Sequence, residues 1–215
     1  MHLSILGYGH VGTAVASALL AAGHKVTLAT NPRRPEGAVA VRDADPRLAA
    51  ATVAEPLAAV TNADAVLLAV PFPVVEDVLA PLADALEGTL LIDATNPVGP
   101  GLTHGLSSRQ SGAERVASLA AGAAVVKAFS VYGYENLADP PTGPDGIRPA
   151  MPYAGDDPTA KATVATLLTG LGWEPIDAGP LAAALDLEHL TLLWVRMVRA
   201  GGLHPRLVWA ALRDR

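Results

Sequence analysis

Three glycines with the spacing G-x-G-x-x-G constrain the fold of this 215-residue chain more than any other feature of its sequence. Gly7, Gly9 and Gly12 follow the apolar run 3–6 and open the alanine-rich run 11–22. This order predicts a strand, a tight turn and a helix, in which Gly9 lets a diphosphate approach the backbone and Gly12 lets the helix pack on the strand. Free amides at a helix start attract phosphate. A glycine turn that binds nothing is the alternative. The predicted pyrophosphate site of a dinucleotide consists of Gly7, Tyr8, Gly9, His10, Val11 and Gly12.

Short apolar runs alternate with helical segments along the first part of the chain. The predicted strands are residues 3–6, 25–29, 65–70, 90–93 and 124–129, and the predicted helices are residues 11–22, 74–86 and 113–121. The strand runs are apolar throughout, which is typical of strands covered on both faces. Ser111 and Glu114 have the spacing of a capping box. The alternation predicts the α/β class, with a Rossmann-like, doubly wound and mainly parallel sheet.

The rest of the chain is less regular. Prolines interrupt residues 31–62, and residues 137–149 have the Pro, Gly and Asp content of a surface loop. Further on, the sequence predicts strands at 151–154 and 173–177, a helix from Pro158 to about residue 171, a helical segment from Leu181 and a last short helix after Pro205. We expect a dinucleotide-binding Rossmann domain over residues 1–150 and a small C-terminal strand and helix part over residues 151–215.

Composition excludes several classes of function. The chain has no cysteine, which excludes disulfides, thiolate catalysis and cysteine-bound metal. Its net charge is −6 and it has no run of Lys or Arg, so nucleic acid is not an expected partner. The longest uncharged apolar run, residues 65–75, is too short to cross a bilayer, and no N-terminal leader is recognised. We therefore expect a cytoplasmic protein that binds neither a membrane nor a metal.

The end of the second predicted strand bears on the choice of dinucleotide. An NAD site usually has an acid there, which accepts a hydrogen bond from the ribose 2′-hydroxyl. Here Thr30 and Asn31 follow the strand, and Arg33 and Arg34 come next. Guanidinium groups bind phosphate through two hydrogen bonds, so these residues favour the 2′-phosphate of NADP(H). The alternative is that the two arginines belong to a solvated turn.

Two further strand ends contribute to the predicted site, because ligands of open α/β sheets lie beyond the carboxyl ends of the strands. Ala69, Val70 and Pro71 end one predicted strand and are expected to line the ribose or nicotinamide of the cofactor. Asn96 follows another strand and is expected to hydrogen-bond the cofactor. Alternatively, Asn96 only starts a turn and Asp93 only caps backbone amides.

No catalytic side chain is identified from the sequence. Residues 105–109 lack the G-x-S-x-G pattern of a hydrolase, and Glu188-His189 has no second metal ligand nearby. Hydride transfer needs neither feature, because the cofactor supplies the reactive group and the protein orients it.

Several motifs in order resemble a known family. They are Gly7-x-Gly9-x-x-Gly12, Gly23-His24, Ala69-Val70-Pro71, Asp93-Ala94-Thr95-Asn96-Pro97, Val126-Lys127-Ala128-Phe129, Ala154-Gly155-Asp156-Asp157 and Asp177-Ala178-Gly179-Pro180-Leu181. Together they resemble the NADPH-dependent coenzyme F-420 reductases (F-420:NADP oxidoreductases) and, more loosely, the cytosolic domain of membrane metalloreductases. The resemblance implies a cytoplasmic homodimer that transfers hydride between NADPH and C5 of the deazaflavin coenzyme F-420.

The resemblance also implies roles for particular residues. Residues 8–11 would hold the pyrophosphate, and Val70 and Pro71 would line the nicotinamide. Thr30, Asn31, Arg33 and Arg34 would hold the 2′-phosphate. Ala128, Phe129, Ser130 and the helices beyond Gly179 would shape the acceptor pocket. Ser130 differs from the histidine or asparagine that relatives carry near this position.

Other functions are compatible with the same sequence. Reduction of an imine or carbonyl would need a proton donor, for which Ser130, Tyr132 and Tyr134 are the local candidates. Reduction of ferric iron or a flavin is a further alternative. A non-catalytic NADP(H) sensor is the third, and the apolar stripe on its C-terminal helix would then contact a partner. That stripe, which is more often core or dimer interface, is Leu190, Leu193, Trp194 and Met197.

Overall fold

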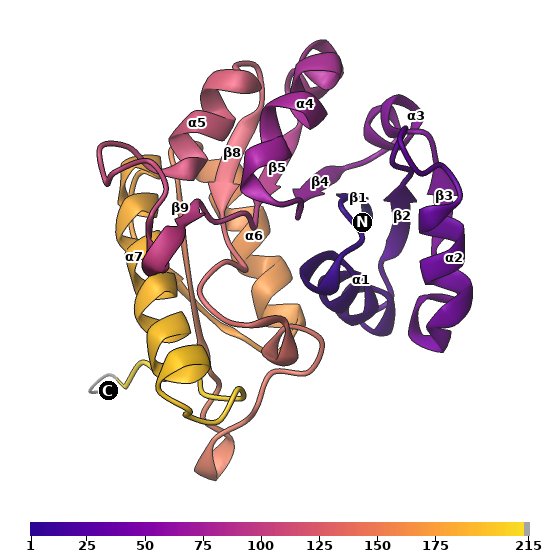
Figure 1. The fold of residues 1–215 in the computed structure, drawn as a ribbon. Coiled ribbons are helices and arrows are strands. Elements are labelled where there is room, and N and C mark those ends of the chain that lie inside the picture. Colours follow the sequence, from indigo (N-terminus) through magenta and orange to yellow (C-terminus); the bar gives the residue numbers. More distant parts are fainter. Residues whose placement is uncertain (213–215) are drawn as a thin grey trace.

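The computed structural model describes residues 1–212, which form a twisted eight-stranded sheet between two layers of helices (Figure 1). The strands of this sheet are β1 (His2–Leu6), β2 (Lys25–Ala29), β3 (Thr52–Ala54), β4 (Ala65–Leu68), β5 (Leu90–Asp93), β8 (Ala124–Lys127), β9 (Ala150–Gly155) and β10 (Glu174–Asp177). The α-helices are α1 (His10–Ala21), α2 (Gly37–Ala44), α3 (Pro56–Thr61), α4 (Val75–Leu79), α5 (Gly112–Leu119), α6 (Pro158–Gly170) and α7 (Ala184–Val195). A π-helical turn, Arg196–Ala200, extends α7. A short hairpin of β6 (Val98–Gly99) and β7 (Thr103–His104) stands outside the sheet.

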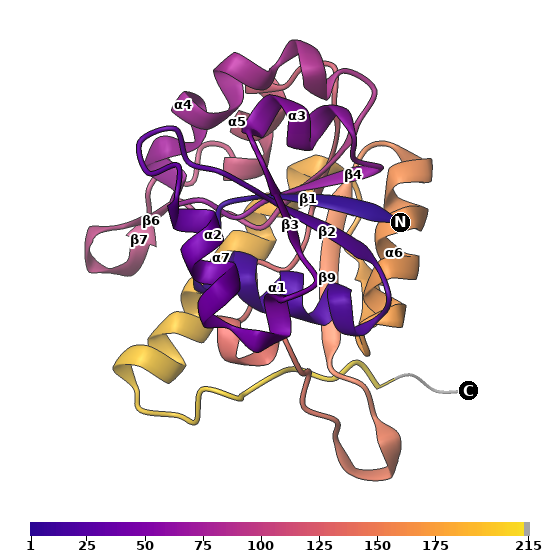
Figure 2. The same ribbon diagram turned by 90° about the vertical axis from the view of Figure 1, so that its right-hand side faces the viewer.

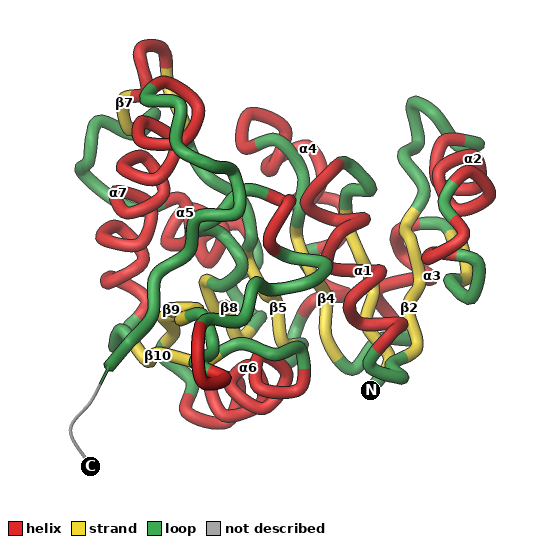
Figure 3. The backbone as a smooth tube through the Cα atoms, turned by 90° about the horizontal axis from the view of Figure 1, so that it is seen from below, coloured by secondary structure: helices red, strands yellow, loops and turns green. Residues whose placement is uncertain are grey.

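The strand order is β10-β9-β8-β5-β4-β1-β2-β3. All pairs are parallel except β8 with β9, so β9 and β10 run against the other six strands. Helices α4, α5 and α7 pack together on one face, and α1 and α6 lie on the other (Figure 3). The predicted Rossmann-like, mainly parallel sheet is confirmed. The chain order reverses between β1 and β4, and this is where open sheets of this class form a ligand crevice.

Several local predictions are confirmed. β2 and β5 have the predicted bounds. Ser111 caps α5 through its side chain, and the Glu114 carboxylate closes the capping box. Asp157 caps α6, whose first residue is Pro158. Residues 137–149 form an irregular connection, as their composition predicts.

Other local predictions are wrong. Residues 74–86 form only the short α4 followed by 3₁₀ turns, because Pro81 cannot donate a backbone hydrogen bond. No helix follows Pro205 in the described residues. This segment instead crosses the end of the sheet in extended form (Figure 2). The Trp209 carbonyl oxygen accepts a hydrogen bond from the Ala150 amide at 2.8 Å. The Leu207 carbonyl oxygen accepts one from the Trp194 indole at 2.8 Å. These contacts with distant residues outweigh the local preference for a helix.

The sheet continues across residue 150, because β9 pairs directly with β8. The proposed division at residue 150 therefore does not coincide with a break in the sheet. No helix within residues 1–212 is long and apolar enough to cross a membrane.

Candidate nucleotide-binding site

The glycine loop between β1 and α1 is built by close backbone contacts. Gly7 has a φ of +105°, which favours glycine, and a Cβ atom at this position would lie 2.5 Å from the Ala69 carbonyl oxygen. A Cβ atom on Gly12 would lie 1.8 Å from the Gly7 carbonyl oxygen. At Gly9, by contrast, a Cβ atom would have no neighbour within 4 Å. The loop is thus tightly packed on its inner side and open at the glycine where a diphosphate would approach.

The first turn of α1 offers free amides to a ligand. Gly9 is the N-cap residue, no side chain caps the helix, and the first turn contains no acidic residue. The positive end of the helix dipole is therefore not neutralised by the protein. The His10 ring stacks on the Tyr134 ring with centroids 4.5 Å apart, which brings the loop after β8 beside the glycine loop.

The turn after β2 presents two arginine side chains to solvent. The Asn31 Oδ1 atom accepts from the Arg33 amide at 2.9 Å, and the Asn31 carbonyl oxygen accepts from the Arg34 amide at 2.7 Å. Asn31 is therefore occupied in shaping the turn. The Arg33 guanidinium pairs with Asp77 of α4 at 3.2 Å, and both side chains are largely exposed. The Thr30 hydroxyl is buried and has no hydrogen-bond partner within residues 1–212.

The ends of β5 and β8 carry the other predicted polar groups. The Asn96 side-chain nitrogen donates to the Ser130 carbonyl oxygen at 2.9 Å, so the structure brings these two predicted site residues together. The Thr95 hydroxyl, the Asn96 Oδ1 atom and the Ser130 hydroxyl are buried and have no hydrogen-bond partner in the part of the chain that the structure describes. Phe129 is buried with a φ of +59°, a strained conformation for a bulky residue. Together with Thr30, these unpaired atoms all lie just beyond the carboxyl ends of strands, which fits a polar ligand there.

Ala69 and Val70 also lie where the sequence predicts. They follow the end of β4 and pack against Gly7, since a Cβ atom on that glycine would meet both of them. The glycine loop, these residues and the Asn96–Ser130 pair thus share the carboxyl edge of the sheet. Their predicted contacts with a nucleotide remain predictions.

A buried ionic cluster under the same edge was missed by the sequence prediction. Lys127, at the end of β8, contacts Asp93 at 3.0 Å and Glu188 of α7 at 2.9 Å, and it donates a short hydrogen bond to the Thr95 carbonyl oxygen. All three ionic side chains are almost completely buried. Burial alone would lower the pKa of Lys127, but the two carboxylates outweigh it and raise this pKa. The signal in the sequence is a lysine inside an otherwise apolar strand, because a fully buried lysine needs a partner.

Glu188 is held from several directions. Its carboxylate accepts from the Gly112 amide at 2.9 Å and from His104 Nε2 at 2.8 Å. The His104 Nδ1 atom accepts from two backbone amides, so this ring carries its proton on Nε2. Burial would raise the pKa of Glu188, but Lys127 and these donors lower it. Asp93 accepts from the Thr95 amide at 2.9 Å, as in the alternative that it caps backbone amides, but it also pairs with Lys127.

Other residues that the sequence analysis considered lie in separate surroundings. The Tyr132 hydroxyl donates to the Ala150 carbonyl oxygen at 2.6 Å and accepts from the Trp209 amide, and burial raises its pKa. This phenol is therefore occupied by structural contacts. His189 contacts the Ser108 hydroxyl at 2.9 Å, and within residues 1–212 no group of His, Asp and Glu side chains is arranged to hold a metal. Trp194 lies in the core, whereas Leu193 is exposed.

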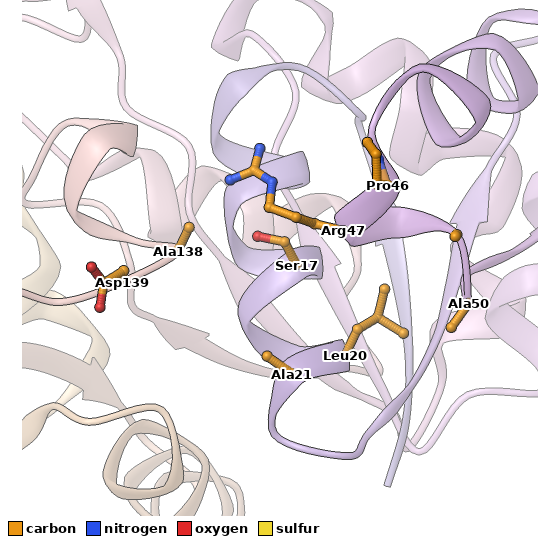
Figure 4. A pocket seen from close by; sticks show the side chains of 9 residues that line it. Ser17, Leu20, Ala21, Pro46, Arg47, Ala50, Ala138 and Asp139 are labelled. Carbon is orange, nitrogen blue, oxygen red and sulfur yellow. The ribbon is translucent and has the colours of Figure 1, made fainter.

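A surface hollow lies apart from this edge (Figure 4). It is bounded by Ser17, Leu20 and Ala21 near the C-terminal end of α1, by the turn that contains Arg47, and by Asp139. Arg47 pairs with Asp45, and the Ser17 hydroxyl donates to a backbone carbonyl. Among the described residues, those that line this hollow carry no buried side-chain polar atom without a partner, so the carboxyl edge is the better candidate site.

Residues 2–97 match the family described as NADP oxidoreductase, coenzyme F420-dependent. The match covers the first part of the chain. The matched region includes the glycine loop, both arginines and Asn96. The predicted resemblance is confirmed, and the match supports NADP(H) as the nucleotide.

The proteins that this chain is similar to include both short and long ones. A protein of Arthrobacter sp. FB24 named for F420-dependent NADP reduction has 28% identity and a TM-score of 0.85, over 98% of this chain and 99% of that one. Protein SMa0349 of Sinorhizobium meliloti has 29% identity and a TM-score of 0.78, over 100% and 96%. Metalloreductase STEAP3 of Rattus norvegicus is 35% identical over 88% of this chain, which spans only 36% of that protein. An imine reductase of Myxococcus stipitatus in complex with NADP⁺ (19% identity, TM-score 0.65, 94% and 64%) shares the fold.

Proposed function

We propose that this protein is an NADP(H)-dependent oxidoreductase that transfers hydride between NADPH and the deazaflavin coenzyme F420. The observation that carries the nucleotide assignment is the uncapped start of α1 beside the open position at Gly9. The match of residues 2–97 to the family model supports NADP(H), and the description of that family supports F420. The glycine loop would bind the pyrophosphate, while Arg33 and Arg34 would bind the 2′-phosphate.

The chemistry that the bound cofactor would supply is transfer of a hydride from C4 of the nicotinamide to C5 of the deazaflavin, which would leave NADP⁺, while the one proton that the deazaflavin takes up would come from solvent. The chain's contribution is orientation and exclusion of water. Val70 and Pro71 would line one side of the nicotinamide, and Ala128, Phe129 and Ser130 would line the acceptor pocket. Such a pocket brings the two reacting carbons to within about 3–3.5 Å. The residues of this chain need supply no general acid for this reaction, in agreement with the structural role of Tyr132.

A metalloreductase or flavin reductase activity is the second candidate. It is favoured by the 35% identity to metalloreductase STEAP3, although that relative is far longer. Imine or carbonyl reduction is less well supported. Among the three candidate proton donors, the Tyr132 hydroxyl is engaged in a structural hydrogen bond, and only the Ser130 hydroxyl is buried without a partner within the described residues. A second copy of the chain is the proposed partner, with the exposed Leu193 of α7 at the interface.

The test is NADPH oxidation measured against a panel of acceptors: coenzyme F420, free flavins, a ferric chelate and a cyclic imine. We expect turnover with F420 and little with the others. Turnover of the ferric chelate or flavins alone would support the second candidate. Tight NADPH binding without turnover of any acceptor would support a sensor, and no calorimetric heat with either pyridine nucleotide would exclude the whole proposal.

A further inference from the structure

Helix α7 is attached to the carboxyl edge of the sheet by two buried contacts, one turn apart. Glu188 pairs with Lys127 of β8 at 2.9 Å. Thr191 donates from its hydroxyl to the Ser130 carbonyl oxygen at 3.0 Å, and also contacts the Leu187 carbonyl oxygen of its own helix. Both attachment points on the sheet side lie at or just beyond the end of β8.

The same contacts reach the neighbouring strand. Lys127 holds the Thr95 carbonyl oxygen directly and Asp93 through an ion pair. Asn96, the next residue, donates to the Ser130 carbonyl oxygen that Thr191 also contacts. The short stretch from Asp93 to Asn96 is thus linked to α7 at both of its ends, through Lys127 at one end and through Ser130 at the other.

This stretch and its partner carry the unpaired polar atoms of the site. The Thr95 hydroxyl, the Asn96 Oδ1 atom and the Ser130 hydroxyl are buried and lack partners within the described residues. Leaving such atoms unpaired destabilises the fold, so their positions point to a ligand that pairs with them. By their place at the ends of β5 and β8, on the far side of the sheet reversal from β2, they would face the nicotinamide end of a bound dinucleotide.

Resting on the proposed function, we propose that Lys127 and Glu188 are positioning residues for the nicotinamide half of NADPH. They touch no reacting atom, and act by fixing Thr95, Asn96 and Ser130 in place. A buried ion pair is usually no more stabilising than a well-packed apolar pair, so stability alone does not account for one here. The need to hold polar atoms in a defined arrangement accounts for the buried pair, because the donors and acceptors of Lys127 and Glu188 are bonded to groups at this edge.

The experiment separates the two halves of the cofactor. Calorimetry measures the affinity of NADPH and of adenosine 2′,5′-bisphosphate, which lacks the nicotinamide, for wild type and for the double variant Lys127→Met with Glu188→Leu. We expect NADPH affinity to fall by about tenfold while the bisphosphate affinity changes by less than about twofold. The matched control is Lys161→Met with Asp177→Leu, an ion pair of 2.7 Å at the far edge of the sheet, which is expected to change neither affinity.

Each other outcome overturns the inference. Equal losses for both ligands would assign the pair a purely structural role, and no loss for either would deny it any role. If the double variant does not fold, Glu188→Gln gives the same comparison with the carboxylate shape retained. Failure of wild type to bind either ligand would instead refute the proposed function itself, and the inference with it.

Discussion

The two ends of the candidate site differ in the groups that they present and in the burial of their charged side chains. At the end proposed to bind the phosphates, which we call the phosphate end, the groups available between β1 and β2 are backbone amides, and the charged side chains are exposed. At the end proposed to bind the nicotinamide, which we call the nicotinamide end, the charged side chains beyond β5 and β8 are almost completely buried and contact residues from distant parts of the chain. Lys127 lies 34 residues from Asp93, and His104 lies 84 residues from Glu188.

This difference indicates which charged side chains affect ligand binding with little effect on the stability of the fold. Exposed charges at the phosphate end stabilise the fold little, so they can be changed for binding with little penalty. Buried charges at the nicotinamide end are part of the core, so each change there affects the whole fold. The predictions below test this contrast.

The largest effect is expected from Lys127→Ala. It leaves two buried carboxylates without their cation, and we expect the free energy of unfolding to fall by about 3–5 kcal/mol. Urea denaturation measures it. The exposed Arg33→Ala is the control, with an expected change within about 0.5 kcal/mol. Similar losses in the two variants would contradict the contrast between the ends.

Gly12→Ala is expected to have the next largest effect. The new Cβ atom would lie 1.8 Å from the Gly7 carbonyl oxygen, and relieving that overlap costs about 3 kcal/mol of stability. Gly9→Ala is the matched variant, because its Cβ atom would meet nothing in the protein. We expect it to leave thermal stability unchanged and to weaken NADPH binding. If Gly9→Ala binds NADPH as wild type does, the open position at Gly9 is not the diphosphate site.

The same contrast explains what the sequence could predict. The glycine loop, the Ser111 capping box and the bounds of β2 and β5 follow from residues close together in the chain. Local spacing therefore predicts them. The Lys127–Glu188 pair could only be suspected from a lysine in an apolar strand, because its partner lies on another helix.

The failures have the same cause. The segment after Pro205 is extended because its backbone pairs with Ala150 and its carbonyl groups meet Trp194. No local pattern encodes such contacts. Likewise, Tyr132 is one of three candidate proton donors for the alternative of imine or carbonyl reduction, and the sequence does not show that its hydroxyl donates to the first residue of β9.

Glu188→Gln is expected to give a stability difference that depends on pH. The pKa of Glu188 is lowered on folding from its usual 4.5, so its carboxylate stabilises the fold above pH 4.5 and loses this effect as the pH falls through the folded pKa. We expect wild type to exceed the variant by about 2–3 kcal/mol at pH 7. Unfolding curves from pH 7 to pH 3 measure the difference. A difference that stays constant over this range would show that folding does not lower the pKa of Glu188.

Replacing both Arg33 and Arg34 by alanine tests the phosphate end. We expect NADPH affinity to fall by about 30-fold, equivalent to about 2 kcal/mol, because two cations that would face the 2′-phosphate are lost. NADH lacks this phosphate and is expected to lose little. Calorimetric titration of both nucleotides measures the ratio. Equal losses would mean that the arginines form only a solvated turn.

Asp77→Asn is expected to have the smallest effect, and in the opposite direction. Asp77 pairs with Arg33 at 3.2 Å in the exposed turn, so its carboxylate competes with and repels a 2′-phosphate. We expect its removal to tighten NADPH binding by about threefold at low salt and less at high salt, with NADH unaffected. Glu76→Gln is the control, because this neighbouring carboxylate pairs with Arg115 instead. If Asp77→Asn weakens NADPH binding, the Asp77 carboxylate orients Arg33 for the phosphate. At both ends of the site, an ion pair would then hold a group in place for the nucleotide.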